Sequence, residues 1–207
     1  MRRSPSEVTA TPYLVPDLLV PKLTLVFCGT APSTASAKAK AYYAKPGNRF
    51  WPTLHAVGIT PHRFAPGDYA KLLQLGIGLT DLCKVHSGTD AQLPEDAFDT
   101  EAFRDKMAQY QPALIAFTSK NAAQTCLLHP VRYGMQAETI GASRLFVLTS
   151  PSGLATRFFD IEIWPCRRRS STASCRQIWI SKNRVARPDG EVSTNNRLSP
   201  RVSVCRP

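Results

Sequence analysis

The sequence lacks the features of a membrane protein, a secreted disulfide scaffold or a zinc protein. No apolar run approaches the roughly 20 residues of a membrane-spanning helix, and the N-terminus has no apolar signal-peptide core. The six cysteines include no C-x-x-C pair and no Cys/His cluster at zinc spacing. Three of them lie in or beside apolar runs: Cys28, Cys83 and Cys126. We therefore expect free thiols in a cytoplasmic protein that holds no metal and binds no membrane.

The basic charge is concentrated at the C-terminus. The formal net charge is +11, and residues 166–207 contribute +8 of it. This segment is rich in Arg, Ser and Asn and shows no sustained hydrophobic period. We predict a disordered basic tail over residues 166–207. A nucleic-acid-binding arm and a shifted reading frame are both compatible with it, so the high pI is no evidence that the folded part binds nucleic acid.

The stretch from Leu23 to Ser33, LTLVFCGTAPS, is the clearest structural signal. Six of the seven residues from Leu23 to Gly29 are apolar or small, which is typical of a strand buried on both faces. The turn after it is followed by a helix-permissive run, Ala35–Tyr43. Such a turn places backbone N–H groups and hydroxyls at the carboxyl edge of a sheet, where open α/β sheets bind ligands. Many strand–turn–helix units only connect elements, so this signal is weak alone.

Three further apolar runs have the same form. Each ends in polar or Gly/Ser/Pro residues, and helical patterns separate them: Ile77–Leu82, Ala113–Phe117 and Arg144–Leu148. The alternation predicts an α/β fold, a three-layer α/β/α arrangement with a central, mainly parallel four-stranded sheet. The four turns would then meet at one edge. We expect a lead-in segment over residues 1–22 and one α/β domain over residues 23–165.

The segment KPGNRFW predicts a turn that leads into a helix, with Asn48 as its N-cap. Phe50 and Trp51 are adjacent, so we expect one to face the core and the other to face solvent or a cleft. Further helices are predicted over Asp68–Leu75 and Asp99–Tyr110.

Five segments carry a resemblance to a known family: LVFCGTAPS, PGNRFW, GLTDL, AFTSK and LTSPSGL. In order and spacing they resemble the motifs of the mismatch-specific uracil/thymine-DNA glycosylases, a branch of the uracil-DNA glycosylase superfamily. They span roughly Leu23 to Leu154, and PGNRFW with PSGL is a specific pair. The resemblance implies an enzyme that flips a damaged base out of DNA and removes it.

The resemblance also implies where the flipped base would bind. The first motif, residues 29–33, would lie beneath the base, Phe50 would stack on it, and Asn48 would lie beside it. Hydroxyls of the turns are candidates to contact the base or a phosphate, although each can equally satisfy the turn backbone. The base-binding candidates are Gly29, Thr30, Ala31, Pro32, Ser33, Asn48, Phe50 and Thr80.

The PSGL-type loop would enter the DNA and help to fill the place that the base has left. Lys120 is a candidate phosphate contact, although a solvated surface lysine is the commoner case. The DNA-binding candidates are Lys120, Ser150, Pro151, Ser152, Gly153, Leu154 and Ala155. These roles suit a glycosylase, which must extrude its nucleotide and hold the base by stacking and edge hydrogen bonds.

One position departs from the family. Its first motif usually reads G-I-N-P-G, and the Asn positions the attacking water, whereas this chain has Ala31. Asp81, at the end of the second strand, is the first candidate to direct the water and to stabilise the cationic sugar. Asp90, in HSGTD, is the second candidate. The plain alternative for Asp81 is a loop-capping role.

Together these features predict a monofunctional uracil-DNA glycosylase, a hydrolase of N-glycosyl bonds. It would act as a monomer on double-stranded DNA, above all at G:U mismatches, without metal or cofactor. No lysine stands where a Schiff base would be expected, so strand cleavage is not predicted. The alternative is a non-catalytic binder of lesions or mismatches, and a third reading is a generic nucleic-acid binder driven by the tail.

Overall fold

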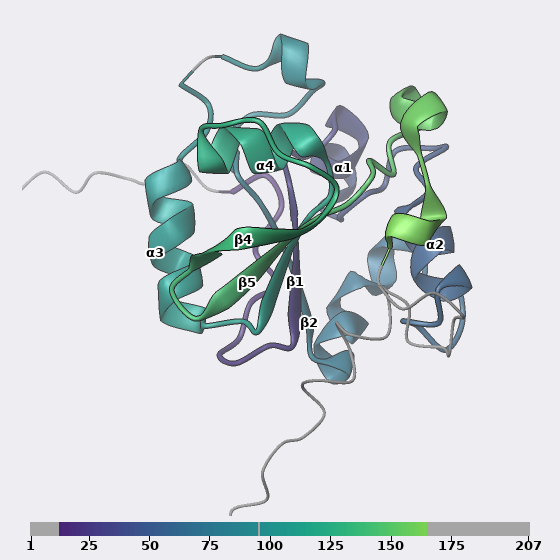
Figure 1. Ribbon diagram of the computed structural model, residues 1–207. Coiled ribbons are helices and arrows are strands. Elements are labelled where there is room, and N and C mark those ends of the chain that lie inside the picture. Colours follow the sequence, from purple (N-terminus) through teal and green to yellow (C-terminus); the bar gives the residue numbers. More distant parts are fainter. Residues whose placement is uncertain (1–12, 95, 165–207) are drawn as a thin grey trace, which may run out of the picture.

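The computed structural model describes residues 13–94 and 96–164, which fold around one five-stranded sheet (Figure 1). Its strand order is β2-β1-β3-β5-β4. The strands are β1 (Leu25–Gly29), β2 (Ile77–Asp81), β3 (Leu114–Phe117), β4 (Gly134–Ile140) and β5 (Ser143–Val147). β1, β2, β3 and β5 run parallel, and β4 pairs antiparallel with β5. The predicted α/β fold with a mainly parallel sheet is therefore confirmed.

Alternate side chains of each parallel strand enter two different cores. In β1, Phe27 packs in the core that includes α2, and Cys28 packs in the core beneath α3 and α4. Figure 1 shows α2 and α3 on opposite sides of the sheet. Because both faces are covered, the parallel strands are apolar throughout, which is why they were visible in the sequence.

In the described part of the chain, four α-helices and four 3₁₀ helices accompany the strands. The α-helices are α1 (Thr34–Ala39), α2 (Phe50–Ala56), α3 (Thr100–Tyr110) and α4 (Lys120–Leu127). The 3₁₀ helices are η1 (Pro66–Leu75), η2 (Asp90–Gln92), η3 (Gly153–Phe158) and η4 (Ile161–Ile163). Three α-helices begin at a side-chain cap, in which Ser33, Asp99 or Ser119 accepts a backbone N–H from the first turn.

The structure corrects four details of the prediction. The sheet has a fifth strand, β4, and the segment after Pro66 is a 3₁₀ helix. Asn48 is not the N-cap of α2, since that position belongs to Arg49. Phe50 and Trp51 are both buried, at 0% and 3% exposure, so neither faces solvent.

Both rings fit in the interior because α2 begins between the sheet and the C-terminal segment. The ring centroid of Trp164 lies 5.9 Å from that of Phe50, and the indole N–H of Trp51 donates to the carbonyl of Tyr42 at 3.1 Å. The segment that ends at Trp164 therefore closes the core over α2.

The ends of the chain are only partly described. Within the predicted lead-in, Leu18 pairs with Leu79 of β2 through backbone bonds of 2.9 and 3.0 Å. The predicted basic tail, residues 166–207, lies outside the described residues. In the described part of the chain, no helix has the length and apolar character needed to cross a bilayer.

Candidate active site

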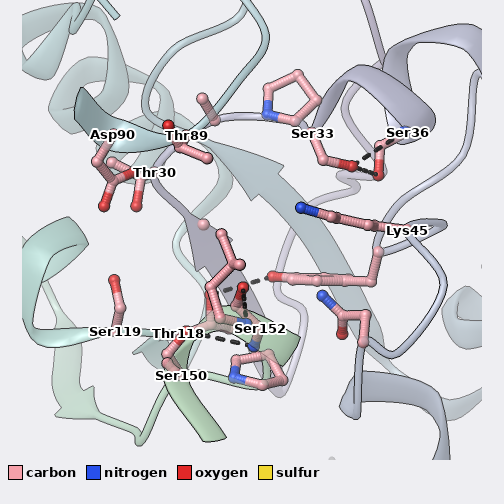
Figure 2. A pocket seen from close by; sticks show the side chains of 18 of the residues that line it. Thr30, Ser33, Ser36, Lys45, Thr89, Asp90, Thr118, Ser119, Ser150 and Ser152 are labelled. Carbon is pink, nitrogen blue, oxygen red and sulfur yellow. Dashed lines mark hydrogen bonds between the residues drawn. The ribbon is translucent and has the colours of Figure 1, made fainter. Parts of the chain in front are cut away.

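A pocket of about 340 Å³ lies at the carboxyl edge of the parallel strands (Figure 2). Segments that follow β1, β2, β3 and β5 all line it, together with the turn before α2. Figure 2 labels ten side chains around the pocket, and two of them are the charged residues Lys45 and Asp90. The other eight carry hydroxyls: Thr30, Ser33, Ser36, Thr89, Thr118, Ser119, Ser150 and Ser152. The convergence of turns that the sequence predicted is therefore present.

The turn after β1 is held in place by backbone bonds from the neighbouring segment. The N–H groups of Leu82 and Cys83 donate to the carbonyls of Gly29 and Thr30 at 3.0 and 2.8 Å. Ser33 ends the turn and caps α1, which fixes its hydroxyl toward Ser36 at 3.0 Å. All five residues of the predicted first motif, residues 29–33, line the pocket.

Asp81 supplies a nearly buried carboxyl group to this pocket. It pairs with Gly29 in the parallel register of β2 and β1, and its side chain is 5% exposed. A Cβ atom on Gly29 would overlap Asp81 Oδ1, so only glycine leaves room for this carboxyl group. Asp81 Oδ2 is buried and has no hydrogen-bond partner among the described residues.

Burial raises the pKa of Asp81 to about 6. The positive charge of Lys84 opposes this shift, and the negative charge of Asp17 adds to it. The carboxyl group can therefore change its ionisation near neutral pH, as a general base must. The structure thus places the first of the two predicted catalytic carboxylates inside the pocket.

A cluster of largely buried charges lies near Asp81. Asp17 forms ion pairs with Lys84 at 2.7 Å and with Lys106 at 2.5 Å, and it accepts the hydroxyl of Thr80 at 2.7 Å. Lys84 also donates to the hydroxyl of Tyr42 at 3.2 Å. Thr80 is fully buried and does not line the pocket, so the prediction that it binds the base does not fit the structure.

The aromatic wall of the pocket is Tyr43, not Phe50. The two rings are stacked, with 3.8 Å between centroids and 14° between planes. Phe50 is 0% exposed and absent from the pocket lining, whereas Tyr43 lines it. The prediction that Phe50 stacks directly on a base is therefore wrong, because Tyr43 covers it.

Tyr43 also has an unusual backbone conformation. Its φ is +54°, in the left-handed region that bulky residues rarely adopt. The hydroxyl donates to Thr118 Oγ1 at 3.3 Å, and burial raises the pKa of Tyr43, so the phenol stays neutral. A strained conformation of this kind is often found where a ligand binds.

Asn48 lines the same pocket as Tyr43, and its predicted place beside a base stays a prediction. Its Oδ1 accepts the backbone N–H of Phe50 at 2.9 Å, and the residue lines the pocket. The bond fixes the side-chain orientation and leaves the amide N–H groups without a partner among the described residues. Those two donors are therefore available to a ligand.

The segment after β5 forms the opposite lip. The carbonyl of Pro151 accepts the backbone N–H of Arg49 at 2.8 Å, which holds this segment against the turn before α2. Leu154 and Phe158 line the pocket mouth, and each is 72% exposed. Of the predicted loop residues, Ser150, Pro151, Ser152, Leu154 and Ala155 line the pocket, while Gly153 packs against the carbonyl of Gly47.

The second predicted carboxylate and the predicted phosphate contact lie further out. Asp90 is exposed at the mouth and accepts a hydrogen bond from Asn121 at 2.5 Å. Lys120 does not line the pocket, and its amine lies 4.4 Å from the centre of the Tyr133 ring. Its contact with DNA stays a prediction.

Several pocket residues were not anticipated from the sequence. They are Ser36, Tyr42, Tyr43, Lys45, Gly88, Thr89, Thr118, Ser119 and Phe158. The adjacent tyrosines before PGNRFW were the available signal for the aromatic wall. Among the described residues, no group of three or more His, Cys, Asp or Glu side chains is arranged to hold a metal ion.

Comparison with known proteins gives two findings. The sequence model of the uracil DNA glycosylase superfamily matches residues 16–168. The fold is also similar to the solution NMR structure of a candidate uracil DNA glycosylase from Methanosarcina acetivorans, with a TM-score of 0.50 and 22% sequence identity. That alignment covers 74% of this chain and 91% of the other. At this identity the likeness supports the fold alone.

Proposed function

This chain belongs to the uracil DNA glycosylase superfamily, and we propose that it is a monofunctional, mismatch-specific uracil-DNA glycosylase. It would hydrolyse the bond between uracil and deoxyribose in double-stranded DNA, with the G:U pair as its main substrate. The observation that carries the proposal is the unpartnered, nearly buried carboxyl group of Asp81 in a pocket walled by an aromatic ring.

The pocket has the means to hold a flipped base. The outer face of Tyr43 offers a flat surface for stacking, and Phe50 supports that ring from below. The free amide donors of Asn48 suit the carbonyl edge of uracil. Extrusion costs least at a weakly paired base, which favours a mismatched uracil over one in a regular pair.

Asp81 suits the chemical step. Breaking an N-glycosidic bond develops positive charge on the sugar, and a nearby carboxylate stabilises that charge in a site that excludes water. The same carboxylate can take a proton from an attacking water. Ala31 lines the pocket where the family's water-positioning Asn would be expected, so this chain needs another group for that task, and Asp81 is the group we assign.

The exposed segment after β5 suits the DNA side of the reaction. Leu154 and Phe158 present apolar side chains to solvent beside the pocket mouth. Apolar side chains that enter a base stack can hold a flipped nucleotide out of the duplex. We assign this wedge role to Leu154 first, with Phe158 beside it.

Single-turnover excision tests the proposal. Duplexes carrying one G:U pair, one A:U pair or no uracil are incubated with excess protein and then treated with alkali, which cleaves at abasic sites. We expect strand breaks at G:U, fewer at A:U, and loss of the breaks in Asp81→Asn but not in Asp90→Asn. Tight binding to G:U without any breaks would instead identify a lesion binder, and loss only in Asp90→Asn would move the catalytic role to the η2 loop.

A further inference from the structure

The hydroxyl of Tyr43 and the carboxyl group of Asp81 face the same point in the pocket. A Cβ atom on Gly29 would overlap Asp81 Oδ1 and lie 3.6 Å from Tyr43 Oη. The two oxygens therefore lie at most about 6 Å from each other, with the Asp81 oxygen in the space that glycine leaves at this position. One water that donates both of its protons in O–H···O bonds of ordinary length joins two oxygens about 4.5 Å apart, which is within this limit.

Hydrogen bonds within the protein set the direction in which Tyr43 can bond. Its hydroxyl donates to Thr118 Oγ1 at 3.3 Å, and the Thr118 hydroxyl donates to the carbonyl of Cys28 at 3.3 Å. This series of hydrogen bonds ends at the carbonyl oxygen of Cys28, which can only accept a hydrogen bond. With its proton directed to Thr118, Tyr43 Oη has lone pairs left for a donor in the pocket.

Asp81 offers the complementary acceptor. Its Oδ1 is the carboxylate oxygen nearest the Gly29 position, and so the one that a water bound by Tyr43 could reach. Its Oδ2 is buried without a hydrogen-bond partner among the described residues, so no bond at that oxygen offsets the cost of burying the carboxylate. A water placed between the two groups would donate one proton to Asp81 and the other to Tyr43. Its lone pair would then point away from both, into the pocket.

We propose that Tyr43 is a catalytic residue that, together with Asp81, binds and orients the attacking water through its hydroxyl. This inference rests on the proposed glycosylase function. It assigns to a tyrosine and an aspartate the task that Ala31 cannot perform. Thr118 acts as a positioning residue, because it fixes the direction of the Tyr43 hydroxyl.

The step balances with water as the only co-reactant. The water oxygen forms a bond to the sugar C1′ as the C1′–N1 bond breaks, and the electron pair of that bond leaves with the base. Asp81 takes one proton of the water and becomes a neutral carboxylic acid. The second proton stays on the new C1′ hydroxyl, and the departing base anion takes a proton from solvent.

Tyr43→Phe tests the inference, because it keeps the ring and removes only the hydroxyl. The first-order rate of uracil release is measured with a saturating excess of protein over a G:U duplex. Affinity is measured separately on a duplex with uncleavable 2′-fluoro-deoxyuridine. We expect the rate to fall about 10- to 100-fold, with the affinity changed less than about 3-fold. Thr118→Val should lower the rate in the same direction by a smaller factor, and Tyr110→Phe, at the end of α3, should leave it unchanged.

Three outcomes would overturn the inference. The first is a Tyr43→Phe protein that releases uracil at the wild-type rate. The second is a loss that appears only in affinity, which would assign the hydroxyl to base binding. In both cases the wild-type protein is active, so the proposed function stands. The third is a wild-type protein that releases no uracil, which would overturn the proposed function and this inference with it.

Discussion

The Asp81 carboxyl group occupies the space where any residue larger than glycine at position 29 would place its Cβ atom. The two residues are partners across the β1–β2 pairing, so the contact is set by the sheet register and not by a mobile loop. The residue at position 29 and the position of the Asp81 carboxyl group, the candidate general base, are therefore coupled. A larger side chain at position 29 must displace that carboxyl group.

Gly29→Ala should displace the Asp81 carboxyl group and abolish most of the excision activity. Because the clash lies at the centre of the sheet edge, we expect at least about a 100-fold loss in single-turnover rate, of the order seen when a general base is removed. Gly67→Ala is the matched control, since a Cβ atom there meets nothing within 4 Å. Equal rates for the two variants would show that Asp81 does not need its present position.

The excision rate should depend on pH through Asp81. The carboxyl group must be ionised to accept a proton, and its pKa is about 6 because burial outweighs the attraction of Lys84. We expect the single-turnover rate to rise from pH 5 and to level off above about pH 7. A profile that is flat from pH 5 to 8 would contradict a catalytic role for this group.

The same burial predicts that the ionised carboxyl group of Asp81 destabilises the fold. The pKa of Asp81 is raised above its value in the unfolded chain, so the contribution of this group to stability is greatest at low pH and is lost as the pH rises through about 6. Asp81→Asn removes this loss and should stabilise the protein at pH 8 by about 1 to 3 kcal/mol in urea unfolding. At pH 4 the gain should nearly vanish.

Asp68→Asn is the control for that comparison. Asp68 is a solvated acid whose pKa is lowered by its bond to Lys71, and the ion pair measures 2.7 Å. Its replacement should not stabilise the protein at pH 8. A gain of similar size in both variants would point to a general effect of removing negative charge, and not to the burial of Asp81.

The wedge assignment predicts a loss of DNA binding without a loss of stability. Leu154 and Phe158 are each 72% exposed, so Leu154→Ala and Phe158→Ala should leave the melting temperature within about 2 °C of wild type. Affinity for a G:U duplex should fall at least about 5-fold for Leu154→Ala, since unstacking is no longer compensated. Leu128→Ala, at the far end of α4 and 84% exposed, is the matched control. Equal affinities for Leu154→Ala and Leu128→Ala would exclude a wedge at position 154.

The sequence allowed the parallel sheet and its binding edge to be predicted because both leave local signals. Strands buried on both faces are apolar throughout, and each ends in a polar or small-residue turn. The fifth strand leaves no such signal. In β4 only Ile140 is buried, since the strand lies at an antiparallel edge of the sheet.

The aromatic wall was misassigned because its position depends on contacts far apart in the chain. Phe50 is buried by Trp164 and by Tyr43, and neither contact is visible in a local pattern. Tyr42 and Tyr43 are adjacent and both line the pocket, yet only Tyr43 has a left-handed backbone conformation and stacks on Phe50, while Tyr42 is 2% exposed. The periodicity of hydrophobic residues does not predict a left-handed conformation at a single residue such as Tyr43. The position of Asp81 at the sheet edge, in contrast, could be predicted because the residue ends an apolar strand that the local sequence shows.

The most direct test of the account is the release of free uracil from a G:U duplex, measured by mass spectrometry under single-turnover conditions at pH 8. Wild-type protein and Asp81→Asn are compared at concentrations that saturate binding of the duplex. We predict release of one uracil per duplex by the wild type, and a decrease in rate of about 100-fold or more for Asp81→Asn. No free uracil from wild-type protein that binds the duplex would contradict the account, and the carboxyl-edge pocket would then serve recognition alone.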